Sequence, residues 1–137
     1  MKPVEILYHR NLKRTSCREG IIEVVMNAGE ALSENEIRER LRGNYDRTTF
    51  YRSFKTLEEH AILHKIVVDN QLVKYALDTT VTHLDAHAHF YCQQCQTVRC
   101  MENIPVARYQ LPDGYQDVAT EVLIKGTCAT CKKLPGS

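Results

Sequence analysis

Apolar residues recur at helical spacing in three segments of the first half of the chain. The first segment begins after Thr15-Ser16, a pair typical of a helix start, and ends near Gly29. The second follows Ser33, which has an acid three residues later in the spacing of a capping box. The third begins near Asp46. The stripes expected to face a core are Ile21, Ile22, Val24, Val25 and Met26, then Ile37 and Leu41, then Phe50, Phe54, Leu57 and Ala61.

The period of the pattern changes after the third helix. The letters ILHKIVV and LVKYAL, separated by Asp69-Asn70-Gln71, predict two strands joined by a tight turn. Three helices followed by a hairpin is the order of a winged helix-turn-helix, although three-helix bundles with a hairpin also occur without DNA binding. The third helix favours DNA binding, because the polar positions near its start suit phosphate and base-edge contacts and include no acid. These positions are Thr48, Thr49, Tyr51 and Arg52.

Composition limits the kind of DNA binding to expect. The chain has 137 residues, 43% hydrophobic content and a formal net charge of +1. That suits one compact domain or two small ones, and it excludes a strongly basic, histone-like protein. Any nucleic-acid surface must therefore be local. Residues 9–18 and 47–55 are basic runs without an acid, although such a run is commonly only a solvated helix face.

The second half of the chain predicts a small β-rich domain. After the polar segment DTTVTHLDA, we expect short strands in HAHFYC, TVRCM, VARYQL and QDVATEVLIKG. The fold class is therefore α+β, with a winged helix-turn-helix domain over residues 1–78, a hinge over 79–86 and a β-rich domain over 87–137.

Cellular location follows from what the sequence lacks. No apolar run is long enough to cross a bilayer, and the N-terminal letters MKPVEILYHR lack the apolar block of a secretory signal. We therefore expect a cytoplasmic protein with no membrane partner. Cytosolic thiols are kept reduced, so six cysteines favour metal binding over disulfides. No nucleophile with a base and an orienting partner is visible, so we do not expect an enzyme.

Two CxxC pairs carry the strongest chemical signal. Cys92, Cys95, Cys128 and Cys131 are soft donors, and four thiolates close a tetrahedral shell around zinc with no open position. The alternative is a pair of redox dithiols, but neither pair has the strand-to-helix setting of a thioredoxin-like site. The sequence therefore predicts a structural zinc ion that joins the two ends of the β-rich half.

A second metal site is predicted beside the first CxxC pair. His87 and His89 share one face of a strand, and a hairpin folded symmetrically about Gln93-Gln94 places Cys100 opposite His87. His83 or Asp85 from the linker could complete the site. Imidazole and thiolate donors favour zinc over iron, although availability in the cell can override that preference. The alternatives are solvated histidines with a small buried cysteine, or a zinc enzyme with an open coordination position.

The segments RTSCR, DRTTFYRSFKTLEEHAIL, HAHFYCQQC and GTCATC together resemble the ferric uptake regulator family of bacterial metal-dependent repressors, over residues 10 to 132. The resemblance implies a β-rich dimerisation domain, a homodimer, and palindromic double-stranded operator DNA bound when a regulatory metal is loaded. The four cysteines match the family's structural zinc site. The resemblance also implies DNA contacts from the recognition-helix residues named above and from the first-helix residues Lys13, Arg14 and Arg18.

The chain departs from the family's pattern at the regulatory site. There the family commonly uses a histidine before the second helix of the helix-turn-helix, an acid after the wing, the paired histidines, and an acid beyond the first CxxC. The matching positions here are about Ala31, Ala76, His87 with His89, and Cys100. The signal is therefore open between iron, zinc or another thiophilic metal, and haem. A constitutive DNA-binding or protein-docking module with only structural zinc is the rival hypothesis.

The family's dimer-domain helix is also replaced, by ENIPVARYQLPDGYQ, whose prolines suit a strand or loop.

Overall fold

The computed structural model describes residues 1–78, 81 and 86–133. The chain divides into two compact units, Met1–Leu84 (unit 1) and Asp85–Ser137 (unit 2), each of which is described by itself. The hinge predicted over 79–86 lies outside the described residues except for Val81 and Ala86. None of the helices in the described ranges is long and apolar enough to cross a membrane.

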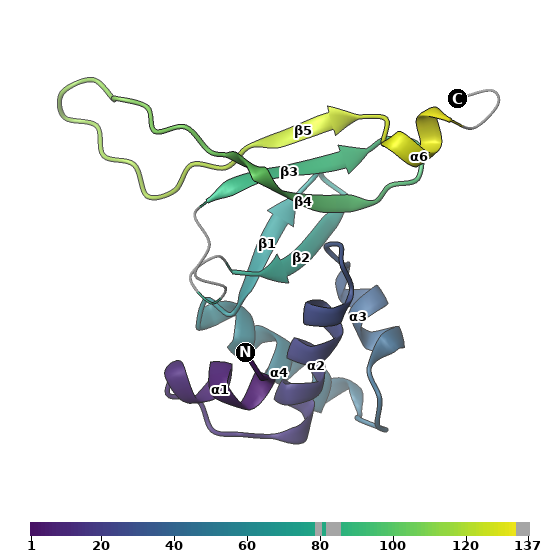
Figure 1. The fold of residues 1–137 in the computed structure, drawn as a ribbon. Helices are drawn as coiled ribbons and strands as arrows, with labels where there is room; N and C mark the ends of the chain where they lie inside the picture. The colour runs from purple at the N-terminus through teal and green to yellow at the C-terminus, as the bar shows by residue number, and fades with distance from the viewer. Residues whose placement is uncertain (79–80, 82–85, 134–137) are drawn as a thin grey trace. The chain divides into compact units, whose positions relative to one another are not determined.

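The described residues of unit 1 form the helices α1 Pro3–His9, α2 Ser16–Asn27, α3 Glu34–Arg40 and α4 Arg47–Glu59 (Figure 1). The three predicted helix starts are confirmed by their caps. The Thr15 side chain accepts from the Arg18 amide and the Asp46 side chain from the Thr49 amide. Ser33 forms the complete capping box. Each cap satisfies backbone donors that the helix itself leaves unpaired. The sequence pattern did not predict α1, which begins with Pro3.

The end of α4 corrects one predicted core position. Ala61 was expected on the apolar stripe, but it lies beyond the helix with a φ of 55° and is exposed. The Ala61 amide donates to the Glu58 carbonyl at 3.1 Å, and the Ile62 amide donates to the Leu57 carbonyl at 2.9 Å. This pair of bonds is a Schellman motif, which ends a helix through a left-handed residue. Ile62 therefore takes the core place expected for Ala61 and is fully buried.

The predicted hairpin is present as β1 Leu63–Val67 and β2 Val73–Leu77, which pair antiparallel with Leu63 opposite Leu77. The Asp69 carboxylate accepts from the Gln71 and Leu72 amides and so shapes the turn. Leu32, between α2 and α3, forms a bridge with Tyr75. The bridge ties this wing to the helices of its own unit.

The apolar stripes of the helices meet the inner face of the wing in one core. The Phe54 ring packs edge-on against Tyr75 with ring centroids 4.7 Å apart. The other buried members of this core include Leu7, Ile21, Ile22, Ile37, Phe50 and Leu57. Because residues on one side of α4 are committed to this core, its opposite side is left for solvent.

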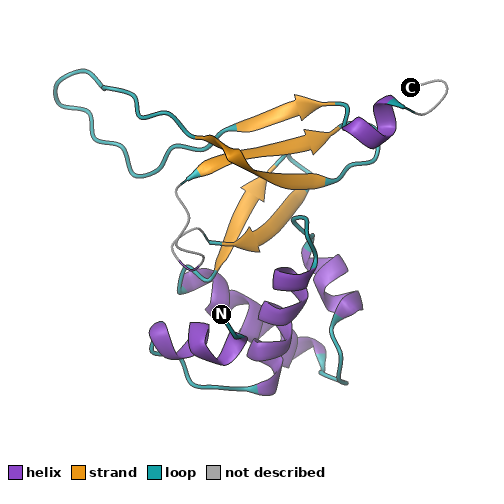
Figure 2. Cartoon of the chain, viewed as in Figure 1, coloured by secondary structure: helices purple, strands orange, loops and turns teal. Residues whose placement is uncertain are grey.

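The part of unit 2 that the structure describes is a three-stranded sheet with one short helix (Figure 2). Its elements are β3 His87–Cys92, β4 Val98–Pro105, β5 Leu123–Gly126 and α6 Ala129–Lys132. The strand order is β4-β3-β5, with β3 antiparallel to β4 and parallel to β5. The strand predicted in VARYQL is wrong, because residues 106–111 form part of a long loop between β4 and β5. Pro105 and Pro112 bracket this stretch, and proline donates no ladder hydrogen bond.

One ion pair joins the wing to α3. Lys74 on β2 is 8% exposed, and its Nζ donates to the Glu36 carboxylate within the capping box of α3. Burial raises the pKa of the Glu36 carboxyl, but hydrogen bonds from Lys74 and Ser33 lower it by more, so the net pKa lies below its ordinary value. A buried lysine is costly unless it is paired, so Glu36 stabilises both the cap and the wing.

We expect Glu36→Gln to lower the free energy of unfolding at pH 7 by about 1–3 kcal/mol, because Lys74 keeps its charge without a counter-ion. A carboxyl with a lowered pKa contributes stability above its unfolded pKa and loses it as the pH falls. The difference between wild type and variant should therefore narrow below pH 4.5, the unperturbed value for glutamate. Urea unfolding followed by helical circular dichroism measures both effects.

The control is Glu59→Gln, on the exposed side of α4, where the carboxylate lies 3.9 Å from Lys55. This substitution should change stability by less than about 0.5 kcal/mol at every pH. Equal effects of the two substitutions would contradict the role given to the Lys74–Glu36 pair.

Candidate metal centres and nucleic-acid interface

Four cysteine sulfurs converge at one end of the sheet of unit 2. Cys92 ends β3, Cys95 lies in the turn toward β4, and Cys128 and Cys131 belong to the start and body of α6. Their four Sγ atoms lie within 4.8 Å of one another, with Cys95 and Cys128 at 3.9 Å. All six cysteines of the chain are free thiols, so the cluster is not a pair of cystines.

Backbone amides point at these sulfurs. Cys92 Sγ accepts from the Cys95 amide at 3.5 Å and from the Cys128 amide at 3.4 Å. These bonds favour the thiolate and lower the pKa of Cys92 to about 6. Burial, followed by the neighbouring cysteine side chains, raises the pKa of Cys131. Without a cation the cluster therefore favours ionisation at Cys92 and disfavours it at Cys131.

The donor set fits a zinc ion. Four sulfurs at mutual distances of this size match a closed tetrahedral shell, and a bound divalent cation compensates the cost of ionising the buried Cys131 thiol. Thr97 is a supporting residue that sequence reasoning missed, since its Oγ1 lies 3.2 Å from Cys95 Sγ and accepts a hydrogen bond from that thiol. The signal available in the sequence was a polar residue, Thr97, two positions after the candidate ligand Cys95.

The second predicted cluster is also brought together. The donor atoms of His87, His89 and Cys100 lie within 4.8 Å of one another. Cys100 Sγ is 3.5 Å from His89 Nε2 and also contacts His87 Nε2. His83, proposed as a further ligand, lies outside the described residues, as does Asp85.

The strand register differs from the prediction, which placed Cys100 opposite His87. Cys100 pairs instead with His89, and the register shifts again between His87 and Ala88. The cause is a longer turn, in which the Cys92 amide donates to the Thr97 carbonyl at 3.0 Å. A shift of two residues keeps every side chain on its predicted face, so the three donors still meet.

The second cluster differs from the first in coordination and exposure. Three donors from the described residues leave a tetrahedral ion with a fourth position for another ligand. His87 is buried, whereas Cys100 on the edge strand β4 is exposed. Partial burial of its sulfur, followed by the charge of Glu102, raises the pKa of Cys100, so the protonated thiol is favoured until a cation displaces its proton. Such a site suits an exchangeable ion.

The predicted DNA-reading residues lie on the solvent side of α4. Thr48, Thr49, Tyr51 and Arg52 are exposed, while Phe50, Phe54 and Leu57 of the same helix are buried. Tyr51 is 39% exposed, and its ring lies edge-on to Phe50 with centroids 5.4 Å apart. The core therefore fixes the helix that presents these polar groups.

The basic residues near α2 are less uniform than the sequence suggested. Arg14 pairs with Glu19 at 3.0 Å, and the Arg18 guanidinium donates to the Lys13 carbonyl at 2.6 Å. Lys13 is exposed and makes no ion pair with the described residues. Arg18 therefore stabilises the segment before α2. Of the three basic residues, Lys13 has the charge that is least compensated by neighbouring groups.

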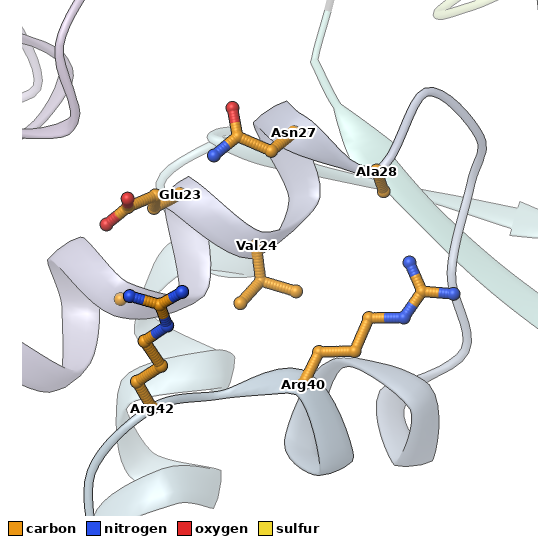
Figure 3. Close-up of a pocket in the computed structure, with 7 residues that line it drawn as sticks. Glu23, Val24, Asn27, Ala28, Arg40 and Arg42 are labelled. Atoms are coloured by element: carbon orange, nitrogen blue, oxygen red, sulfur yellow. The ribbon is translucent and has the colours of Figure 1, made fainter.

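Unit 1 also has a surface hollow of about 290 Å³ between α2 and α3 (Figure 3). Arg40 and Arg42 extend on either side of Val24 at its floor. Both arginines are exposed, and Arg40 lies 3.8 Å from Glu30 outside the hollow. The charged groups that line the hollow do not converge on one point, so the hollow lacks the arrangement of a small-molecule site.

Comparison with known proteins identifies the family. The model of the ferric uptake regulator family matches residues 9–113. A search of curated proteins found none that matches the chain.

Solved structures share the fold. The ferric uptake regulator of Helicobacter pylori, described as having three functional metal binding sites, is 16% identical with a TM-score of 0.64, over 97% of this chain and 91% of that one. The Vibrio cholerae ferric uptake regulator is 18% identical with a TM-score of 0.65, over 90% and 98%. A zinc uptake regulator complexed with zinc and DNA is 20% identical with a TM-score of 0.60, over 94% and 89%.

Substitution of one ligand in each cluster should separate the two sites. Cys131→Ser should abolish zinc binding by the four-cysteine cluster and unfold much of unit 2, because the closed shell is broken. Cys100→Ser should keep that ion and weaken the second site by more than the roughly 10–100-fold that loss of an outer-shell partner costs. Elemental analysis of zinc per chain after dialysis, with hydrogen exchange of unit 2, measures both. Identical zinc loss in the two variants would contradict two separate sites.

Proposed function

We propose that this chain, which belongs to the ferric uptake regulator family, is a homodimeric repressor that binds a palindromic operator when a regulatory metal ion is loaded. Family membership makes it a metal-responsive, DNA-binding transcription regulator and not an enzyme. The repressor role, the dimer, the symmetry of the operator and the assignment of individual residues are our proposals.

One observation carries the metal part of the proposal. Unit 2 holds two donor clusters, of which one has four cysteines and the other has His87, His89 and Cys100. We assign zinc to the four-cysteine cluster as a structural ion, since a closed thiolate shell exchanges metal poorly. We assign the regulatory ion to the second cluster, where one coordination position is left for a further ligand. Zinc suits its mixed imidazole and thiolate donors better than iron does.

The regulatory ion must bind the DNA-competent conformation more tightly than other conformations, since otherwise it cannot shift the population. His83 belongs to the segment that joins the two units in the sequence. We infer that its capture as the fourth ligand links metal loading to the placement of the winged helices. In a dimer, two recognition helices about 34 Å apart enter major grooves one helical turn apart.

DNA contacts are assigned from the exposed polar surface of unit 1. Thr48, Thr49, Tyr51 and Arg52 are proposed to reach base edges and nearby phosphates from α4. Lys13 and Arg14 are proposed to contact the phosphate backbone, with Arg18 positioning their segment through the Lys13 carbonyl. A solved relative in complex with zinc and DNA supports this use of the fold.

A constitutive DNA-binding module with only structural zinc is the second candidate. It is favoured by Ala31 and Ala76, which stand where the family commonly places regulatory ligands and which offer no donor atom. Ala31 is buried and Ala76 is half-buried in unit 1. The two candidates differ in whether operator binding depends on metal once the four-cysteine cluster is filled.

The double variant His89→Ala, Cys100→Ser should bind its operator with no dependence on added zinc, at the affinity of zinc-depleted wild type. Wild type should bind at least about fivefold more tightly when zinc is added, the lower end of common coupling energies. Fluorescence anisotropy, using an operator selected from random DNA, measures this at a chelator level that leaves the four-cysteine ion in place. An unchanged zinc response in the variant would exclude the second cluster, and an absent response in wild type would favour the constitutive module.

Arg52→Ala should weaken operator binding by about 1–3 kcal/mol, roughly 5-fold to 150-fold, and relax the base preference at one position of each half-site. Lys13→Ala should weaken binding to all sequences alike and reduce the slope of log K against log salt by about one. Arg99→Ala, an exposed arginine on β4 of unit 2, is the control and should change neither. An Arg52→Ala variant with wild-type base preference would contradict the assignment to α4.

A further inference from the structure

The loop of residues 106–122 between β4 and β5 (the β4–β5 loop) is the most exposed apolar part of unit 2. Figure 1 shows it projecting beyond the ends of the strands it connects. Tyr109 is 69% exposed, Tyr115 is 72% exposed, and Val118 is fully exposed. Leu111 is exposed as well. A cluster of large apolar side chains in water is the usual mark of an interaction surface.

The β4–β5 loop is held only at its ends and its tip. At its base the Val106 amide donates to the Ala86 carbonyl, and the Val122 carbonyl accepts from the His89 amide. At its tip the Tyr115 amide donates to the Pro112 carbonyl across a turn in which Gly114 has a φ of 89°. Between base and tip, the backbone makes no other hydrogen bond to the backbone of the described residues. The two limbs therefore leave many backbone donors and acceptors for a partner.

A hollow of about 690 Å³ lies between the limbs near their base. One limb contributes residues 105–109, the other contributes residues 117–120, and Ala86 closes the end. The lining includes the apolar residues Val106, Tyr109 and Val118 and the charged residues Arg108 and Asp117. A polypeptide turn with apolar side chains and one acid fits this chemistry, because its apolar side chains can contact those of the lining and its acid can pair with Arg108.

We propose that the β4–β5 loop is a dimerisation arm, and that its tip docks between the limbs of the same arm on a second copy of this chain. The tip, Leu111 to Tyr115, carries exposed apolar side chains around one acid, Asp113. Arg108, the only cation of the arm, lines the hollow. Two copies related by a two-fold axis place each tip in the hollow of the other and form two Arg108–Asp113 pairs.

The second copy is favoured over an unrelated partner by self-complementarity. Each arm supplies both the tip and the hollow, so one symmetric contact fills both at once, as an isologous interface requires. Neither Arg108 nor Asp113 makes an ion pair with the described part of its own chain. Both charges are therefore available for the copy.

Charge reversal tests the proposal, which rests on the homodimer of the proposed function. Arg108→Glu alone places two acids together in each contact, and Asp113→Arg alone places two cations together. Each variant should therefore associate with itself at least about tenfold more weakly than wild type. Mixing the two variants should restore the dimer as a heterodimer, because one contact then keeps the native Arg108–Asp113 pair and the other joins the two introduced side chains, which carry opposite charges. Sedimentation velocity of the zinc-loaded full-length chain, without DNA, measures association.

Mixing distinguishes an exchange between copies from a contact within one arm. An intrachain pair would be restored only by combining both substitutions in one chain, and that result would overturn the proposal. Tyr115→Ser should also weaken association, whereas Tyr8→Ser on α1, where Tyr8 is 77% exposed, is the matched control and should not.

The remaining outcomes distinguish failure of the dimerisation-arm proposal from failure of the proposed regulatory function. A monomeric wild type, or a dimer unchanged by every arm substitution, overturns the arm. Arm-dependent association in a chain that binds no operator overturns the proposed function and supports the arm. Metal-dependent operator binding by a dimer that the arm substitutions leave unchanged overturns the arm and supports the proposed function.

Discussion

The convergence of four cysteine sulfurs is the constraint on which unit 2 depends. In this unit the buried hydrophobic side chains among the described residues are Ala88, Cys92, Val98 and Cys131, and two of these belong to the candidate four-cysteine metal site. Three strands and one short helix cannot bury enough apolar surface to offset the entropy lost on folding. Metal–sulfur bonds that join the end of β3 to α6 would supply the missing stabilisation, as they do in other small metal-binding domains.

β3 connects the two donor clusters. Cys92 stands at its end, and His89 lies three residues earlier, about 10 Å along an extended strand. An ion held by the four cysteines would order β3 and so hold both histidines toward Cys100 before any second ion arrives. Under the proposed assignment the same strand would have two roles. An ion in the closed shell would stabilise the scaffold, and an ion in the incomplete shell would exchange with the surroundings.

Unit 1 is built to present α4 without rearrangement. The Asp46 cap fixes its start, the Schellman motif at Ala61 fixes its end, and Phe50 and Phe54 anchor its inner side. The Leu32–Tyr75 bridge and the Lys74–Glu36 pair hold the wing to the same helices. A DNA-binding helix that is already positioned loses little conformational entropy on binding. Regulation of this protein would therefore act on the placement of its two units, and of the two copies in the proposed dimer, rather than on α4 itself.

Local interactions explain what the sequence by itself determined. Helix caps, apolar stripes and the Asp69 turn involve residues a few positions apart, so their pattern predicted α2, α3, α4 and the wing. Alternation of side chains along the two strands of an expected hairpin was sufficient to group His87, His89 and Cys100. Tertiary structure decided the rest. The hairpin register followed from the length of a turn that residue types leave open, and Ala61 left the core because Ile62 packed there. The partner of Lys74 lies 38 residues away, beyond any local pattern. Residues 106–111 alternate as a strand would, yet a strand forms only where a neighbouring ladder accepts its hydrogen bonds, and beyond Val106 the described part of the chain offers none.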